Sequence, residues 1–162
     1  MPAPLLIGSS EPFSGKSAVA LGLGRLLARQ GISLRFGKPL ATMPAGLAQD
    51  ASPPGDDAPL IDADTRFLGS FLGLGPDQLI PSLHRLDPAS AHQRLLAGDL
   101  EAGEGFAALR RALAPDPAQP EDEQLVMLEG AGSLSEGLLF GLSLPQLAHG
   151  LGAEVEIGRA HV

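Results

Sequence analysis

A turn rich in glycine and serine, set between a short apolar run and a helical pattern, constrains this chain more than any other feature. It lies in residues 5–17, which read LLIGSSEPFSGKS. The apolar run 5–7 predicts a buried strand, and Gly15-Lys16-Ser17 closes the turn where a helix over residues 17–30 is expected to begin. A strand, such a turn and then a helix is the layout of a phosphate-binding loop, whose backbone N–H groups face phosphates.

In this interpretation the closing residues have separate roles. Lys16 reaches the terminal phosphates, and the hydroxyl of Ser17 binds Mg²⁺. The residues expected to bind the nucleotide are Ser10, Glu11, Ser14, Gly15, Lys16 and Ser17. The match to the pattern GxxxxGKS/T is incomplete, because Ser10 stands where the first glycine is expected and Gly8 lies two residues earlier. An ordinary turn with an exposed lysine is the competing interpretation, and the flanking strand and helix favour the phosphate loop.

Composition and charge exclude several classes of protein. The chain has 162 residues, enough for one domain with a core, and no cysteine, so disulfides and thiolate metal sites are ruled out. Its net charge of −8 argues against nucleic acid or an anionic membrane surface as a partner. The N-terminal residues have too short an apolar run and too little positive charge for a signal peptide, so we expect a cytoplasmic protein.

Apolar runs alternate with helical patterns along the chain, which predicts an α/β fold with a mostly parallel sheet flanked by helices. The expected strands cover residues 5–7, 32–36 and 125–128. The expected helices cover residues 17–30, 63–72, 89–96, 103–113 and 144–151. Residues 43–59 and 115–123 are rich in proline, glycine and acid, and are predicted to be surface loops or partly disordered linkers.

Glu129 is the first of three further candidate groups. It ends the apolar run 125–128 and precedes a glycine-rich turn. Ligands of open α/β sheets bind at the carboxyl ends of the strands, so a carboxylate there is placed to bind Mg²⁺ directly or through water. The alternative is a glutamate that caps or solvates the end of a strand.

The other two groups follow the second expected strand. Lys38, held between Gly37 and Pro39, is placed to meet an anion, and Thr42 adds a hydroxyl four residues later; an exposed turn is the alternative. Asp62 and Asp64 stand at an expected helix start, where acids complement the helix dipole whatever their function. Either acid can instead reach a metal ion, and Asp64 is the better candidate.

Taken in order, these motifs resemble one family. The phrases GSSEPFSGKS, GKPLAT, DADTRF and LEGAG resemble the dethiobiotin synthetase-like phosphate-loop domains. The longer phrases SSEPFSGKSAVALGLG and LEGAGSLSEGLLFGLSLPQ resemble more closely the copy of that domain at the N-terminus of some phosphotransacetylase-family proteins. The resemblance covers nearly the whole chain. It implies a P-loop NTPase fold with ATP and Mg²⁺ as cofactors.

The resemblance also implies roles for single residues. Lys16 and Ser17 would bind the ATP phosphates and Mg²⁺, and Asp64 and Glu129 would help Ser17 to hold the metal. Lys38 of the KPxxS/T phrase, with Thr42, would meet a substrate or its carbamate. The implied catalytic residues are therefore Lys16, Lys38 and Thr42. The family reaction is an ATP-driven ring closure of a carbamate made from CO₂ and a diamine, through a carbamic-phosphoric anhydride.

The chain departs from the synthetase pattern after Gly132, where it reads SLSEGLLFGLSLPQ instead of a short substrate-facing turn and an Asp-containing segment. Two functions therefore stay open. The preferred one is a nucleotide-sensing module that regulates a C-terminal phosphotransacetylase-like domain. The other is an ATP-dependent ligase or transferase acting on a small anionic metabolite. A homodimer is also left open.

The end of the chain is expected to lie outside the fold. Glu154 and Glu156 interrupt the apolar run that a strand covered on both faces needs. The segment that grips the base in the resembled family does not appear either. We therefore expect residues 1–155 to form an incomplete nucleotide-binding domain whose C-terminal part is missing, and residues 156–162 to be a tail.

Overall fold

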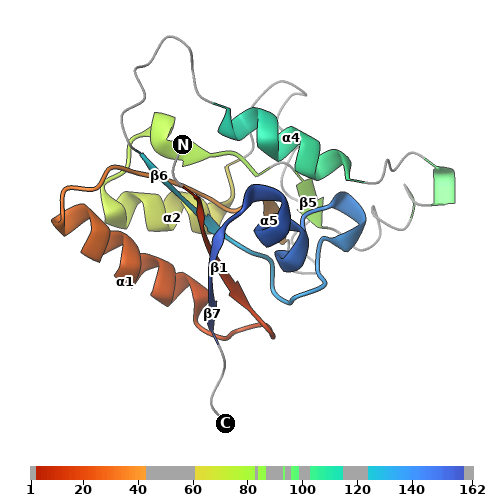
Figure 1. Ribbon diagram of the computed structural model, residues 1–162, viewed down its shortest axis with the longest axis horizontal. Coiled ribbons are helices and arrows are strands. Elements are labelled where there is room, and N and C mark those ends of the chain that lie inside the picture. The colour runs from red at the N-terminus through yellow and green to blue at the C-terminus, as the bar shows by residue number, and fades with distance from the viewer. Residues whose placement is uncertain are drawn as a thin grey trace.

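The computed structural model describes residues 3–42, 61–82, 84–86, 93, 96–98, 103–114 and 124–158, and its architecture is α/β (Figure 1). Five strands form one sheet in the order β4-β2-β6-β1-β7, and every pairing in it is parallel. They are β1 (Leu5–Ser9), β2 (Leu34–Gly37), β4 (Leu79–Ile80), β6 (Leu125–Glu129) and β7 (Glu154–Gly158). A second, two-stranded sheet pairs β3 (Leu40–Thr42) with β5 (His84–Leu86), also in parallel.

Helices cover both faces of the larger sheet. Figure 1 shows α1 (Lys16–Arg29) and α2 (Ala63–Leu72) on one side of the sheet, and α4 (Glu104–Leu113) and α5 (Leu144–Leu151) on the other. Two short 3₁₀ segments, η1 (Pro76–Gln78) and η2 (Leu138–Phe140), lie between these helices and strands. Parallel strands buried between two helical layers need the near-continuous apolar runs that β1 and β6 supply.

The core is divided by the sheet because successive strand side chains point to opposite faces. Ile7 joins Phe36 and Met127 in a cluster that also contains side chains of α1 and α2. Its neighbour Leu6 joins Leu128 in the other cluster, with residues of α4 and α5. The paired strands β1 and β6 therefore contribute side chains to both apolar clusters, one on each face of the sheet.

The predicted elements and the observed ones agree closely where both exist. The strands expected at 5–7, 32–36 and 125–128 correspond to β1, β2 and β6, and the helices at 63–72 and 144–151 have the bounds of α2 and α5. The helix expected at 17–30 begins one residue earlier, and that at 103–113 one residue later. The loops 43–59 and 115–123 lie outside the described residues, as does most of the helix expected at 89–96.

The end of the chain differs from expectation. β7 pairs with β1 over five residues, from Leu5 opposite Glu154 to Ser9 opposite Gly158. The expected domain boundary at residue 155 therefore falls inside a strand and leaves its last three residues, 156–158, in the expected tail. The physical reason is that β7 stands at the edge of the sheet with exposed side chains, so its backbone pairing does not require a continuous apolar run. Residues 159–162 lie outside the described part of the chain.

Candidate functional site

Three strands deliver the predicted site residues to one edge of the sheet. Because β1, β2 and β6 are parallel, their carboxyl ends lie together, and Ile7 pairs with Glu129 while Gly37 pairs with Leu128. Lys38 directly follows β2. This edge is where open α/β sheets bind their ligands.

The turn between β1 and α1 has the conformation that its glycine allows. Gly15 is the N-cap residue of α1 with φ of 81°, in the left-handed region where a side chain would be strained. Phe13 also has a positive φ of 58°, and its side chain is exposed. Ser10 and Glu11 are exposed as well. The hydroxyl of Ser14 is buried, and none of the described residues provides it with a hydrogen-bond partner.

Lys16 lies at the start of α1 and points back toward the end of β1. Its Nζ donates a hydrogen bond to Ser9 Oγ at 2.9 Å, and Ser9 Oγ donates to the carbonyl oxygen of Gly132 at 3.2 Å. Burial lowers the pKa of Lys16, although the negative charge of Glu129 opposes that shift. A buried ammonium held by a neutral hydroxyl is a cation suited to binding an anion.

Glu129 is the most deeply buried acid of this edge, with 3 % of its surface exposed. Its Oε1 accepts a hydrogen bond from Ser17 Oγ at 3.1 Å, and its Oε2 has no partner among the described residues. Burial raises the pKa of Glu129, while the charges of Lys38 and Lys16 and the bond from Ser17 lower it in part. An unpartnered buried carboxylate oxygen is costly, and a bound cation would relieve that cost.

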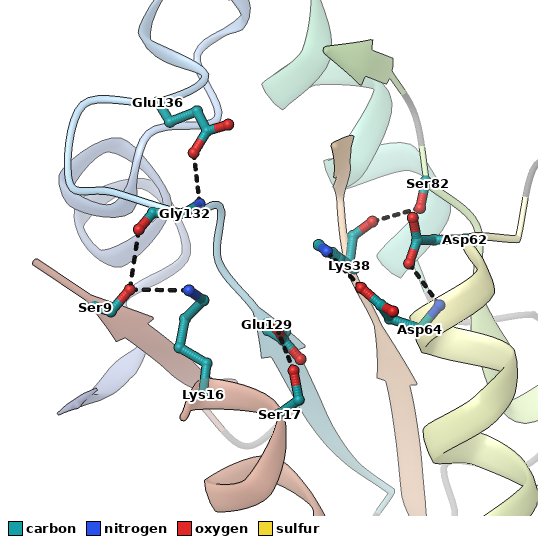
Figure 2. Close-up of polar contacts among 10 residues, drawn as sticks. All are labelled: Ser9, Lys16, Ser17, Lys38, Asp62, Asp64, Ser82, Glu129, Gly132 and Glu136. Carbon is teal, nitrogen blue, oxygen red and sulfur yellow. Dashed lines mark hydrogen bonds and ion pairs between the residues drawn. The ribbon is translucent and has the colours of Figure 1, made fainter. Parts of the chain in front are cut away.

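Lys38 lies across the site from Lys16 and is paired with an acid of α2 (Figure 2). Its Nζ is 3.0 Å from Asp64 Oδ2, and its backbone oxygen accepts a bond from Ser82 Oγ at 2.6 Å. Burial by itself lowers the pKa of Lys38, but the bond to Asp64 and the charges of Asp62, Asp64 and Glu129 together raise it above its usual value. Asp62 caps α2 through a hydrogen bond from the backbone N–H of Asp64.

The structure thus brings together five of the residues that the sequence singled out, in two groups. Lys16, Ser17 and Glu129 form one group, and Lys38 with Asp64 forms the other, near enough for its charges to act on Glu129. Asp64 is engaged by Lys38 and has 61 % of its side chain exposed. Thr42 ends β3, and its side chain lies outside what the structure describes.

The oxygen atoms of Ser17 and Glu129 fit a hard divalent cation. Mg²⁺ is usually bound through one or two protein oxygens together with water and substrate phosphates. Within the described ranges, no group of three or more histidines and acids is arranged to hold a metal ion. The hydroxyl of Ser17 and the carboxylate of Glu129 are ligands of the kind that Mg²⁺ accepts.

Sequence reasoning did not identify Ser9, Gly132 or Glu136. Ser9 joins Lys16 to Gly132 as described above, and the N–H of Gly132 donates to Glu136 Oε2 at 2.6 Å. The sequence provides a weak indication for Ser9, because this residue directly precedes the predicted phosphate-binding turn. It provides none for Glu136, which lies in the irregular stretch after the LEGAG phrase.

Comparison with known proteins adds no assignment: no family model matches the chain, and the search of curated proteins found no match. In the described part of the chain, no helix combines the length and the apolar character needed to cross a bilayer.

Proposed function

We propose that this chain is a P-loop domain that binds a nucleoside triphosphate, with ATP as the expected nucleotide, together with Mg²⁺ through residues 10–17. The observation that carries the proposal is the contact between Ser17 and Glu129, which leaves one buried carboxylate oxygen unpartnered beside it. A serine that follows a Gly-Lys pair and an acid that ends a neighbouring strand are the two protein groups that hold Mg²⁺ in P-loop enzymes.

Lys16 supports the anion half of the proposal. It is buried near the N-terminus of α1, and its hydrogen bond goes to the neutral hydroxyl of Ser9. An ammonium so placed adds its charge to the backbone donors of the turn. Together, Lys16 would bind phosphate oxygens while Ser17 and Glu129 would hold the cation.

We infer a nucleotide-sensing role, which would regulate a phosphotransacetylase-like domain, in preference to catalysis. Lys38, the residue expected to meet a second substrate, is already paired with Asp64. An anionic metabolite would have to compete with that carboxylate. One observation favours the alternative, an ATP-dependent ligase or transferase: Lys38 is itself buried and its charge acts on Glu129, so a ligand bound there would lie close to the nucleotide.

Nucleotide titration by isothermal calorimetry tests the binding proposal. We expect Lys16→Ala to weaken MgATP binding by about 2 to 5 kcal/mol, because it removes a positive partner from a desolvated anion. Arg25→Ala is the matched control, since Arg25 is a cation exposed on the same helix. Equal affinities for wild type and Lys16→Ala would reject the phosphate-loop assignment.

A hydrolysis assay separates the two functions. A sensing module binds MgATP with negligible turnover, and its Lys38→Ala variant binds nucleotide as tightly as wild type. Turnover stimulated by a small anionic metabolite, and lost in Lys38→Ala, would instead establish the ligase or transferase.

A further inference from the structure

Gly132, in the turn after β6, has both of its backbone groups engaged at the site. Its carbonyl oxygen accepts from Ser9 Oγ, and its N–H donates to Glu136 Oε2. Ser9 in turn accepts from Lys16. Figure 2 shows these residues as one continuous series of contacts, from Glu136 through Gly132 and Ser9 to the ammonium of Lys16.

Glu136 is held as a bound anion would be held. Backbone N–H groups and a nearby ammonium are the donors that phosphate-binding turns present to their ligands. The N–H of Gly132 donates to the carboxylate of Glu136 at a short distance, 2.6 Å. The charge of Glu136 also acts on Lys16, where it opposes the effect of burial on the pKa of the lysine.

The carboxylate of Glu136 lies against Gly132, which itself lies close to the phosphate-binding turn. A Cβ built on Gly132 would stand 2.6 Å from Glu136 Oε2 and 3.9 Å from Cγ of Pro12, which belongs to the turn. The N–H of Gly132 and the ammonium of Lys16 are two hydrogen-bond donors, connected through the hydroxyl of Ser9. The N–H already donates to the carboxylate of Glu136.

We propose that a bound polyphosphate accepts a hydrogen bond from the backbone N–H of Gly132, and that Glu136 competes with it because its carboxylate already occupies that donor. The inference rests on the proposed function and goes beyond it by naming a residue that limits affinity. When only a fraction of molecules has the donor free, the apparent dissociation constant increases by the inverse of that fraction. Removing the competitor should therefore tighten binding.

Calorimetric titration with inorganic tripolyphosphate and with MgATP tests the competition. In Glu136→Gln the acceptor is neutral and holds the Gly132 N–H less strongly, so we expect binding to tighten on the order of tenfold. The matched control is Glu154→Gln, which removes one charge at the opposite end of β7, beside Leu5. Its affinity for both ligands should remain that of wild type.

A second variant displaces the carboxylate without removing its charge. The methyl group of Gly132→Ala would stand 2.6 Å from Glu136 Oε2, too close for the carboxylate to stay where it is, and would make only ordinary contact with Pro12. The carboxylate is the far end of a flexible side chain and can move away. We expect it to tighten binding in the same direction as Glu136→Gln. Tightening in Glu136→Gln but not in Gly132→Ala would show an effect of charge alone and would overturn the proposal, as would equal tightening in Glu154→Gln.

The remaining outcomes distinguish this inference from the proposed function. If wild type binds in a Lys16-dependent manner and neither Glu136→Gln nor Gly132→Ala binds more tightly, the competition is refuted while nucleotide binding stands. If no variant binds either ligand, both fail. Binding that is detectable in Glu136→Gln and Gly132→Ala but not in wild type or Glu154→Gln would support both.

Discussion

Gly158, the last residue of β7, lies against Ser14 of the phosphate-binding turn: a Cβ on Gly158 would stand 3.3 Å from the carbonyl oxygen of Ser14. The edge strand thus reaches the turn at the point where β1 ends, opposite Ser9. Residues beyond 155 consequently support the candidate site as well as the sheet.

Shortening the chain measures that support. A chain ending at residue 155 loses three paired residues of β7, whereas a chain ending at residue 158 retains the whole strand. We expect the shorter chain to be less stable by about 2 kcal/mol, from two or three lost backbone hydrogen bonds. Urea unfolding measures this difference, and equal midpoints for the two chains would show that the end of β7 contributes nothing.

The pH dependence of stability follows from the raised pKa of Glu129. A carboxyl group whose folded-state pKa is raised adds stability below its usual pKa, and that stability is lost as the pH rises through the raised value. In the presence of a chelator, wild type should therefore lose stability relative to Glu129→Gln as the pH rises above 4.5, the ordinary pKa of a glutamate, and through the raised pKa of Glu129.

Unfolding by urea at several pH values measures this difference. Mg²⁺ at neutral pH should recover part of the loss in wild type but not in Glu129→Gln, because the neutral amide lacks the charge that a hard cation prefers. A difference in unfolding free energy that does not change with pH would mean that Glu129 is not perturbed by its burial.

Thr65 offers a test of an unsatisfied hydroxyl. It is fully buried on α2, and its Oγ1 has no hydrogen-bond partner among the described residues. Thr65→Val replaces that hydroxyl with a methyl group, so we expect a gain of about 1 kcal/mol and a melting temperature higher by roughly 2 to 4 °C. Thr65→Ser keeps the hydroxyl and should be no more stable than wild type. Calorimetric melting of the three proteins decides the matter.

Two glycines in different surroundings should respond in opposite directions to alanine. A Cβ on Gly37 would stand 2.7 Å from the backbone oxygen of Ile80, so Gly37→Ala should destabilise the fold by about 1 to 3 kcal/mol. Nothing lies within 4 Å of a Cβ on Gly22 in α1, and Gly22→Ala should stabilise it by about 1 kcal/mol. Equal changes in unfolding free energy would contradict the close packing of β2 on β4.

The sequence predicted the fold class because the signals of its central elements are local. Apolar runs at β1 and β6 and the helical patterns of α1, α2 and α5 follow from the burial that each element requires. β7 was misjudged because an edge strand lacks the continuous apolar run by which a central parallel strand is recognised. Glu154 and Glu156 were interpreted as the end of an apolar strand, whereas they are exposed residues of a strand at the edge of the sheet.

The site was predictable in part for a related reason. That Lys16, Ser17 and Glu129 lie together could be predicted, because a loop motif and a strand end limit where such side chains can lie. The bond from Gly132 to Glu136 could not be predicted, because it depends on the path of an irregular turn whose residues show no periodic pattern.

The strand order has a consequence for how the chain acquires its structure. β1 is followed directly by α1, yet its two neighbours in the sheet, β6 and β7, begin only at Leu125 and Glu154. During synthesis the first strand emerges with neither pairing partner available until the last third of the chain has followed. Such non-local pairing slows folding and leaves apolar strand edges open to other chains meanwhile. Nascent chains halted before β6 should therefore be the species most prone to aggregate and most dependent on chaperones.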